Sequence, residues 1–189
     1  AIIKVIKRGV QFVKNGQCSA ICTMPISKSI LKEGANFPFP GHTEYLAHLD
    51  ESKNYAMMLV NKYLRVVPVT IHIPIKDITK YLNAELIEKT IKTTHKELTS
   101  RFSISNPNIW ISGLNPHAGE NGTIGKEEQE FIIPIIKKLQ SEGYNLQGPL
   151  SADTMFYGKK RHYFDAAICM YHDQALIPIK TLDFHSSIN

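Results

Sequence analysis

Three histidines follow short apolar runs of the sequence, and their positions suggest a metal site. His72 lies in PVTIHIP, His117 in GLNPHAG and His172 in MYHDQ. Neutral imidazoles bind Zn²⁺, Co²⁺ and similar divalent cations, and they can leave coordination positions open for a substrate. A metal held in this way polarises a hydroxyl or carbonyl oxygen. Because the three histidines are far apart in sequence, only the fold can bring them together.

A structural role for each histidine is the competing interpretation. An isolated histidine at the end of a strand is more often a hydrogen-bonded structural residue than a metal ligand. Widely separated histidines also lack the short spacing that makes a zinc motif specific. Position alone therefore suggests a metal site without assigning one.

Carboxylates and lysines accompany the histidines. Asp173 directly follows His172, and Asp153 lies in PLSADT. Each carboxylate could ligate a metal, orient a ligand or accept a proton, or it could simply begin a helix or cap a turn. Lys28 in TMPISKS and Lys180 in IPIKT could pair with a phosphate or carboxylate, or extend into solvent.

Glycines recur between His117 and the next amphipathic run. Gly119, Gly122 and Gly125 lead into the predicted helix 126–143, whose first N–H groups could bind a phosphate. Their order is not that of a dinucleotide-binding fingerprint. A flexible turn into the helix is therefore the better interpretation.

Short apolar runs alternate with longer amphipathic ones, a pattern typical of a layered α/β fold. Asn61 and Lys62 separate two apolar runs and predict a hairpin, so the sheet should be mixed. Ligands of open α/β sheets bind beyond the carboxyl ends of the strands, where the three histidines are expected. The predicted strands are 18–23, 55–60, 64–73, 108–113 and 165–171, and the predicted helices are 1–16, TEYLAHLDES after Gly41, 84–102 and 126–143.

Composition narrows the class of protein. The 189 residues can bury one core or form a piece of a larger two-domain protein, and the sequence opens inside an amphipathic run. The net charge of +5 is dispersed without a basic stripe or a recognised reading motif, which argues against nucleic-acid binding. No apolar run could cross a membrane, so we expect a cytoplasmic protein. The three cysteines, an odd number in apolar segments, are expected to be buried, reduced thiols.

Four blocks of the sequence resemble, in this order, the central part of 4-hydroxythreonine-4-phosphate dehydrogenase, an enzyme family of pyridoxal 5′-phosphate biosynthesis. They are TMPISKSILKEGANFPFPGHTEYLA, GLNPHAGENGTIGKEE, GPLSADTMF and DAAICMYHDQALIPIKTLDF. The blocks cover about half of the chain, and the NPHAGE and MYHDQ blocks are the most specific. Ala175 stands where the family usually has glycine.

The resemblance implies a set of site residues. His72, His117 and His172 are the implied ligands of a divalent metal (zinc, cobalt or magnesium), whereas no residue is assigned to the nicotinamide cofactor. His42, Thr43, Lys180 and Asn189 are the implied substrate contacts. Our own hypothesis for the catalytic residues is Lys180 as the group for carboxylate or phosphate contact and proton transfer, with Asp173 and Asp153 in support.

The resemblance also implies a fold and an assembly. We expect a three-layer α/β/α structure with a mixed sheet, like isocitrate and isopropylmalate dehydrogenases, with two subdomains around a cleft. The family forms a homodimer whose active sites use residues of both subunits. Because the family pattern extends past both ends of this sequence, residues 1–189 are expected to be a partial chain of one dehydrogenase domain, lacking the N-terminal and C-terminal segments.

The implied reaction is oxidation of 4-phosphooxy-L-threonine with NAD (NADP is the alternative cofactor), followed by decarboxylation to 3-amino-2-oxopropyl phosphate. Two other functions remain open. Related dehydrogenases act on other phosphorylated four-carbon acids, such as erythronate phosphate. Phosphate acyltransferases share the fold but need no metal, and the three histidines argue against them.

Overall fold

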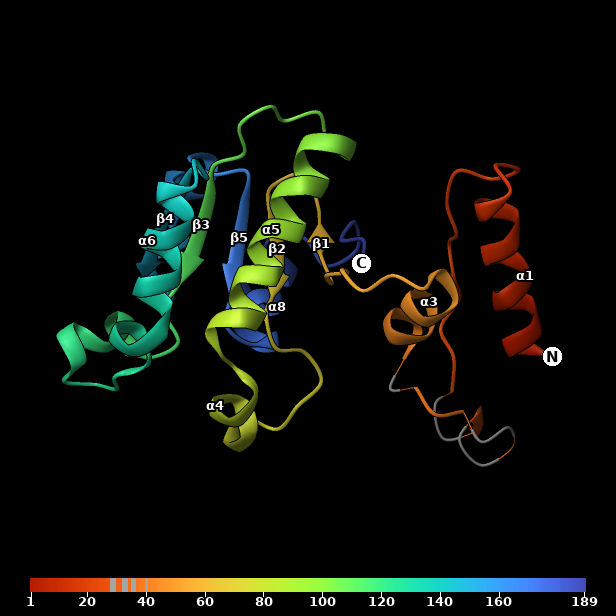
Figure 1. Cartoon of the computed structure of the whole chain (residues 1–189), viewed down its shortest axis with the longest axis horizontal. Helices are drawn as coiled ribbons and strands as arrows, with labels where there is room; N and C mark the ends of the chain where they lie inside the picture. Colours follow the sequence, from red (N-terminus) through yellow and green to blue (C-terminus); the bar gives the residue numbers. More distant parts are fainter. Residues whose placement is uncertain (28–29, 32–33, 35–36, 40) are drawn as a thin grey trace. The chain divides into compact units, whose positions relative to one another are not determined.

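A computed structural model describes residues 1–27, 30–31, 34, 37–39 and 41–189, and it divides into two compact units, Ala1–Tyr55 and Ala56–Asn189 (Figure 1).

The described part of the first unit includes the helices α1 (Ile2–Lys14) and α3 (His42–Asp50). Apolar residues of α1 recur at helical spacing, so one stripe of the helix can be buried. That stripe and α3 contribute to a small core of Ile6, Leu31, Phe37 and Tyr45. The phenol of Tyr45 donates a hydrogen bond to the Ile3 carbonyl of α1 (3.4 Å), which joins the two helices.

The second unit contains a five-stranded sheet in the order β1-β2-β5-β3-β4. β1 pairs antiparallel with β2, whereas the β2–β5, β5–β3 and β3–β4 pairs are parallel. The predicted hairpin is confirmed, because Oδ1 of Asn61 accepts from the backbone N–H groups of Tyr63 (2.9 Å) and Leu64 (3.0 Å). The strands are β1 (Leu59–Val60), β2 (Arg65–Pro68), β3 (Ile109–Ser112), β4 (Leu146–Leu150) and β5 (Ala166–Cys169).

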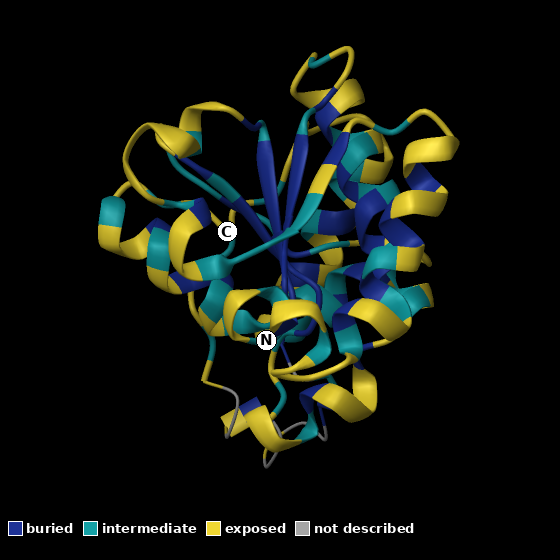
Figure 2. Cartoon of the chain, turned by 90° about the vertical axis from the view of Figure 1, so that its left-hand side faces the viewer, coloured by how far each residue is buried: buried dark blue, intermediate teal, exposed yellow. Residues whose placement is uncertain are grey.

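Helices cover both faces of this sheet, which confirms the three-layer α/β/α prediction for the second unit. Alternate strand residues point to opposite faces. Val67, Ile111 and Ile168 pack with α5 and α6, and Trp110 and Cys169 pack on the opposite face with α8. Figure 2 shows the central strands as the most deeply buried elements. The main helices are α4 (Ile78–Tyr81), α5 (Ala84–Arg101), α6 (Ile133–Ser141), α7 (Ala152–Met155) and α8 (His172–Leu182).

Shorter helical turns join these elements. They are the 3₁₀ turns η1 (Ile75–Asp77) and η4 (Gly158–His162), the π-helical turn η3 (Glu128–Ile132) and the left-handed turn η2 (Pro116–Gly122). The predicted helix 126–143 is therefore a π-helical turn followed by an α-helix.

One predicted strand, 18–23, is wrong. Its residues form an irregular segment in which Cys18 and Cys22 are exposed and Ile21 lies against Gly9 of α1. A strand needs a partner, and the described part of the first unit contains none. The prediction of buried thiols is also wrong for Cys18 and Cys22, but it is confirmed for Cys169.

Four elements are missing from the prediction: β4, α8 and the four-residue helices α4 and α7. The Gly148–Pro149 pair within β4 reads as a turn, and Pro178 lies inside α8. None of the described helices is long and apolar enough to span a bilayer.

We expect replacement of Ile168 by alanine to lower the free energy of unfolding by about 2–5 kcal/mol, because its side chain is completely buried in β5 and a cavity would remain. The matched control is Ile75→Ala, whose side chain is 75% exposed and whose loss should cost at most about 0.5 kcal/mol. Urea unfolding of both variants measures the difference. Equal unfolding midpoints would contradict the assigned burial.

Candidate functional site

The parallel pairing of β2 with β5 brings His72 and His172 together. Pairing continues beyond the strands, since the Val69 N–H donates to the Cys169 carbonyl (2.8 Å) and Thr70 donates to the Met170 carbonyl through its N–H (3.2 Å) and hydroxyl (2.7 Å). His72 and His172 lie two residues farther along each chain segment. Their ring centroids are 5.5 Å apart.

His172 is the first residue of α8 and is oriented by its neighbour in the chain. Its Nδ1 lies 2.9 Å from Oδ1 of Asp173. A carboxylate on one ring nitrogen fixes the orientation of an imidazole and leaves the other nitrogen for a metal. Asp173 is thus suited to the orienting role that is one of its predicted alternatives.

His117 begins a left-handed turn. The φ angles of His117, Ala118, Gly119, Glu120 and Asn121 are +52°, +52°, +78°, +41° and +57°. Such a conformation costs about 1–2 kcal/mol for each residue that carries a Cβ atom. Strained backbone of this kind persists only where its surroundings enforce it, and it clusters at functional sites.

A buried carboxylate organises the segment before this turn. Glu128 is 1% exposed. Its Oε1 accepts from the backbone N–H groups of Leu114 (2.8 Å) and Asn115 (2.8 Å), and its Oε2 accepts from Nδ2 of Asn115 (2.9 Å). These bonds satisfy a buried charge that would otherwise be costly.

The three glycines of the turn have conformational and packing roles. Gly119, Gly122 and Gly125 all have positive φ angles. A Cβ atom on Gly119 would lie 2.6 Å from Oε2 of Glu128, and one on Gly122 would lie 2.6 Å from Oε1 of Gln129. The interpretation of the glycines as a turn into the helix is thereby confirmed.

Gln174 connects the ends of β3 and β5. Its Oε1 accepts from the hydroxyl of Ser112 (2.6 Å) and from the N–H of Met170 (2.7 Å), while its Nε2 donates to the carbonyl of Gly113 (2.8 Å). The side chain therefore holds the start of α8, which carries His172, against the segment that leads to His117.

A cavity of about 440 Å³ adjoins these elements. Asp153 and Asp173 contribute carboxylates to its lining, and apolar side chains of α8 supply much of the rest. The hydroxyl of Ser151 donates to Oδ1 of Asp153 (2.6 Å), which lowers the pKa of that carboxyl, and the nearby charge of His117 lowers it further. The apolar lining residues include Phe156, Ile177, Pro178 and Leu182.

The predicted metal ligands are only partly gathered within one chain. His72 and His172 are adjacent, whereas His117 interacts electrostatically with Asp153. Among the described residues, no group of three or more histidine, cysteine or acidic side chains is close enough to hold a metal ion.

The predicted substrate contacts are spread over both units. His42 and Thr43 begin α3 in the first unit, and Nε2 of His42 is buried without a hydrogen-bond partner among the described residues. Lys180 is exposed on α8, with its ammonium group 5.4 Å from the centre of the Phe184 ring.

Asn189 follows Ile188, which pairs antiparallel with Val60 and therefore runs in the direction of β2. Lys28 lies outside the described residues.

Comparison with known proteins places the sequence in a family. The model of the family "Pyridoxal phosphate biosynthetic protein PdxA" matches residues 1–189. The chain belongs to the PdxA family. Two curated relatives, both named 4-hydroxythreonine-4-phosphate dehydrogenase, are from Paracoccus denitrificans (50% identity) and Roseobacter denitrificans (51% identity). Each alignment covers 100% of this chain, but only 60% and 58% of the respective relative.

A solved structure supports the same assignment. The crystal structure of 4-hydroxythreonine-4-phosphate dehydrogenase from Klebsiella pneumoniae matches this PdxA-family chain with a TM-score of 0.90 and 36% identity. The match covers 98% of this chain and 57% of that one. The chain thus spans a little under three-fifths of the length of that structure.

Glu128 and Gln174 are site residues of this PdxA-family chain that its sequence motifs do not single out. Both residues lie in the sequence blocks that contain the histidines. Gln174 is the last residue of MYHDQ, and Glu128 follows the glycine turn. No sequence signal separates Glu128 from the polar residues around it, because its burial and its backbone partners appear only in the structure.

We expect Gly119→Ala to destabilise the PdxA-family chain more than Gly143→Ala does. Both glycines have positive φ angles, +78° and +94°, but a Cβ atom at Gly143 would meet no atom within 4 Å. Gly143→Ala should therefore cost only the strain of about 1–2 kcal/mol, whereas the clash with Glu128 should add about 1–3 kcal/mol. Denaturant unfolding measures both costs, and similar values would argue against the close contact.

Gln174→Leu should lower the free energy of unfolding by about 2–3 kcal/mol, because it leaves Ser112, Met170 and Gly113 without the partner that satisfies their polar atoms. The matched control is Gln147→Leu on β4, whose side chain is exposed and should change stability by at most about 0.5 kcal/mol. Thermal and urea unfolding measure the effect. A Gln174 variant as stable as the control would show that this connection is dispensable.

Proposed function

We propose that the full-length protein is an NAD-dependent and metal-dependent dehydrogenase of pyridoxal 5′-phosphate biosynthesis. Its reaction is oxidation of 4-phosphooxy-L-threonine followed by decarboxylation to 3-amino-2-oxopropyl phosphate. The observation that carries the proposal is the pair of adjacent imidazoles, His72 and His172, together with Asp173, which contacts Nδ1 of His172 and also lines the cavity. The names of the curated relatives supply the substrate.

The donor set suits a divalent metal. Two adjacent imidazoles and an orienting carboxylate, Asp173, are the kind of ligand shell that zinc and cobalt prefer, and magnesium is a third candidate. His117 is the third proposed ligand. Because no three ligand side chains gather within the described chain, we propose a homodimer in which a second copy completes the set.

The bound metal supplies Lewis-acid polarisation of the substrate oxygens. The protein residues then have separate tasks. Asp153, one of the two carboxylates that line the cavity, would accept the proton of the substrate hydroxyl, and a bound nicotinamide would take up the hydride. Lys180 provides a positive charge for the carboxylate or phosphate, and it is the candidate for the later proton transfer.

The phosphate end of the substrate is assigned to His42 and Thr43. Both lie at the N-terminus of α3, where backbone N–H groups and the helix dipole favour an anion. The unsatisfied Nε2 of His42 is an additional donor for such a ligand. We propose a cytoplasmic enzyme that acts on a phosphorylated small molecule and binds neither nucleic acid nor a membrane.

The first test is elemental analysis of the full-length protein together with NAD reduction on 4-phosphooxy-L-threonine. We expect about one divalent ion per subunit and turnover that a chelator abolishes. NADP in place of NAD, and erythronate phosphate in place of the proposed substrate, are the comparison reactions. Higher turnover on erythronate phosphate would replace the proposed substrate, and metal-independent turnover would exclude the mechanism.

His172→Ala should weaken metal binding by about 100-fold or more, because even outer partners of metal ligands account for about 10–100-fold. Turnover should fall with metal content while the protein stays folded. The control is His162→Ala, an exposed histidine of η4 beyond the candidate site. Metal titration and circular dichroism of both variants provide the measurement. Normal metal affinity in His172→Ala would remove it from the ligand set.

A further inference from the structure

The buried carboxylate of Glu128 has a role that the proposed reaction does not include. We propose that Glu128 is a positioning residue, which holds the turn that carries His117 and thereby sets the place of that imidazole. The role of His117 as a metal ligand rests on the proposed function, whereas the contacts of Glu128 come from the structure alone.

The contacts of Glu128 lie on both sides of His117 in the chain. Before the histidine, Oε1 accepts from the N–H groups of Leu114 and Asn115, each at 2.8 Å. After it, Gly119 packs so closely on Oε2 that a Cβ atom would come within 2.6 Å. One carboxylate thus fixes both ends of a short segment with His117 between them.

The helical segment that carries Glu128 is anchored in the hydrophobic core. Glu128 is the first residue of η3, and the helical segment continues into α6. Ile132 and Leu139 of that segment are completely buried in the core against the sheet. Because Glu128 is attached to the core, the turn is held relative to the sheet that places His72 and His172.

A neutral side chain of the same shape cannot replace this carboxylate without a penalty. Nδ2 of Asn115 donates to Oε2 of Glu128 (2.9 Å) and also to Oε2 of Glu127 (2.8 Å). In a Glu128→Gln variant, the new amide N–H group would face this Nδ2 donor. Rotation of the Asn115 amide would relieve that conflict but would turn its oxygen toward the carboxylate of Glu127.

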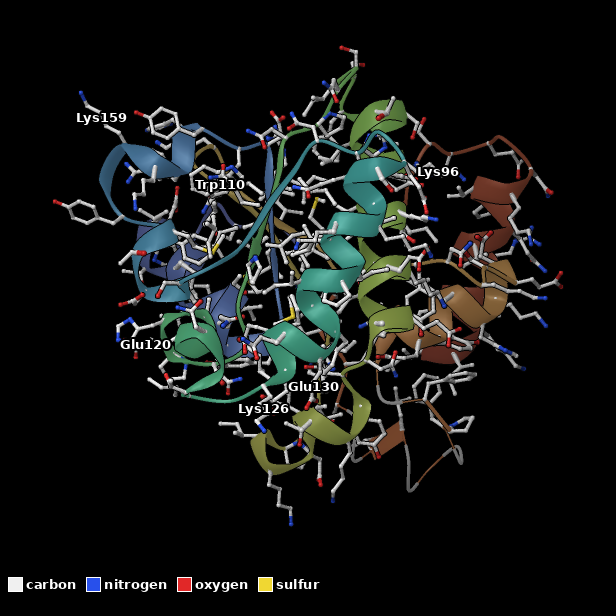
Figure 3. All side chains as sticks on the ribbon, turned by 60° about the vertical axis from the view of Figure 1, so that its left-hand side comes forward. Lys96, Trp110, Glu120, Lys126, Glu130 and Lys159 are labelled. Carbon is white, nitrogen blue, oxygen red and sulfur yellow. The ribbon has the colours of Figure 1, made fainter. Side chains whose placement is uncertain are left out.

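The experiment compares Glu128→Gln with Glu130→Gln in the full-length protein. Glu130 lies two residues farther along and is exposed, and Figure 3 labels it near Lys126 at the start of the same helical segment. His117→Ala is the reference for complete loss of the ligand. The readouts are zinc affinity by competition with a chromophoric chelator, amide hydrogen exchange at residues 114–121, and thermal unfolding.

We expect Glu128→Gln to bind zinc about 10–100-fold more weakly than the parent protein, as partners of metal ligands do when replaced. Amide exchange should accelerate at residues 114–121 and stay unchanged in the central strands. Glu130→Gln should change neither readout. If Glu128→Gln does not fold, Glu128→Asp takes its place, because it keeps the charge but is too short to reach both ends of the turn.

A role limited to stability gives a different result. Zinc affinity equal to that of Glu130→Gln in the folded variant, or exchange that accelerates throughout the chain, overturns the positioning role. Weaker zinc binding in His117→Ala alone also overturns it, but leaves the ligand set of the proposed function intact. Unchanged zinc binding in both variants overturns both proposals.

Discussion

Parallel pairing of β5 with β2 on one side and β3 on the other is the constraint on which the candidate site depends. Parallel strands end at the same edge of a sheet, so the residues that follow them meet there even when they are distant in sequence. The adjacent rings of His72 and His172 result directly from the β2–β5 register. The segment that leads to His117 follows β3, and Gln174 ties it to the end of β5.

The surroundings compensate for an unfavourable backbone at this edge. Several consecutive residues with positive φ angles would not persist in an isolated peptide. Here the turn is placed by acceptors on Glu128 and by the absence of a side chain at Gly119. The interior side of the turn is therefore polar and closely packed, although the imidazole of His117 itself is exposed. Such an arrangement keeps the imidazole accessible while the backbone that carries it is held in place.

The sequence predicted an element correctly wherever a local pattern of residues determined its secondary structure. Hydrophobic periodicity predicted α1 and α5, and the Asn61 hairpin predicted the mixed sheet. The sequence-based prediction failed where the secondary structure depended on residues that are distant in the sequence. The apolar run 18–23 has strand-forming residues but no strand to pair with in the described part of its unit, and Pro178 concealed α8 although Ala175, Leu176 and Ile179 share one buried face.

The candidate site follows the same rule: its motifs can be recognised in the sequence, but the contacts between distant residues cannot. The motifs singled out His72, His117 and His172, but the spatial pairing of His72 with His172 required the strand order, which spacing cannot supply. The role of Glu128 depends on contacts with backbone groups, and those groups carry no sequence signature.

The position of β5 also has a consequence for how the protein is made. β5 is the last of the five strands in the sequence, yet it lies in the centre of the sheet. During synthesis, β2 and β3 therefore leave the ribosome before the strand that separates them exists, and their unpaired edges are open to incorrect pairing. Long-range parallel pairing is slow, so the middle of the sheet closes late. Because His172 follows β5 directly, its imidazole can meet that of His72 only after this late strand has paired with β2.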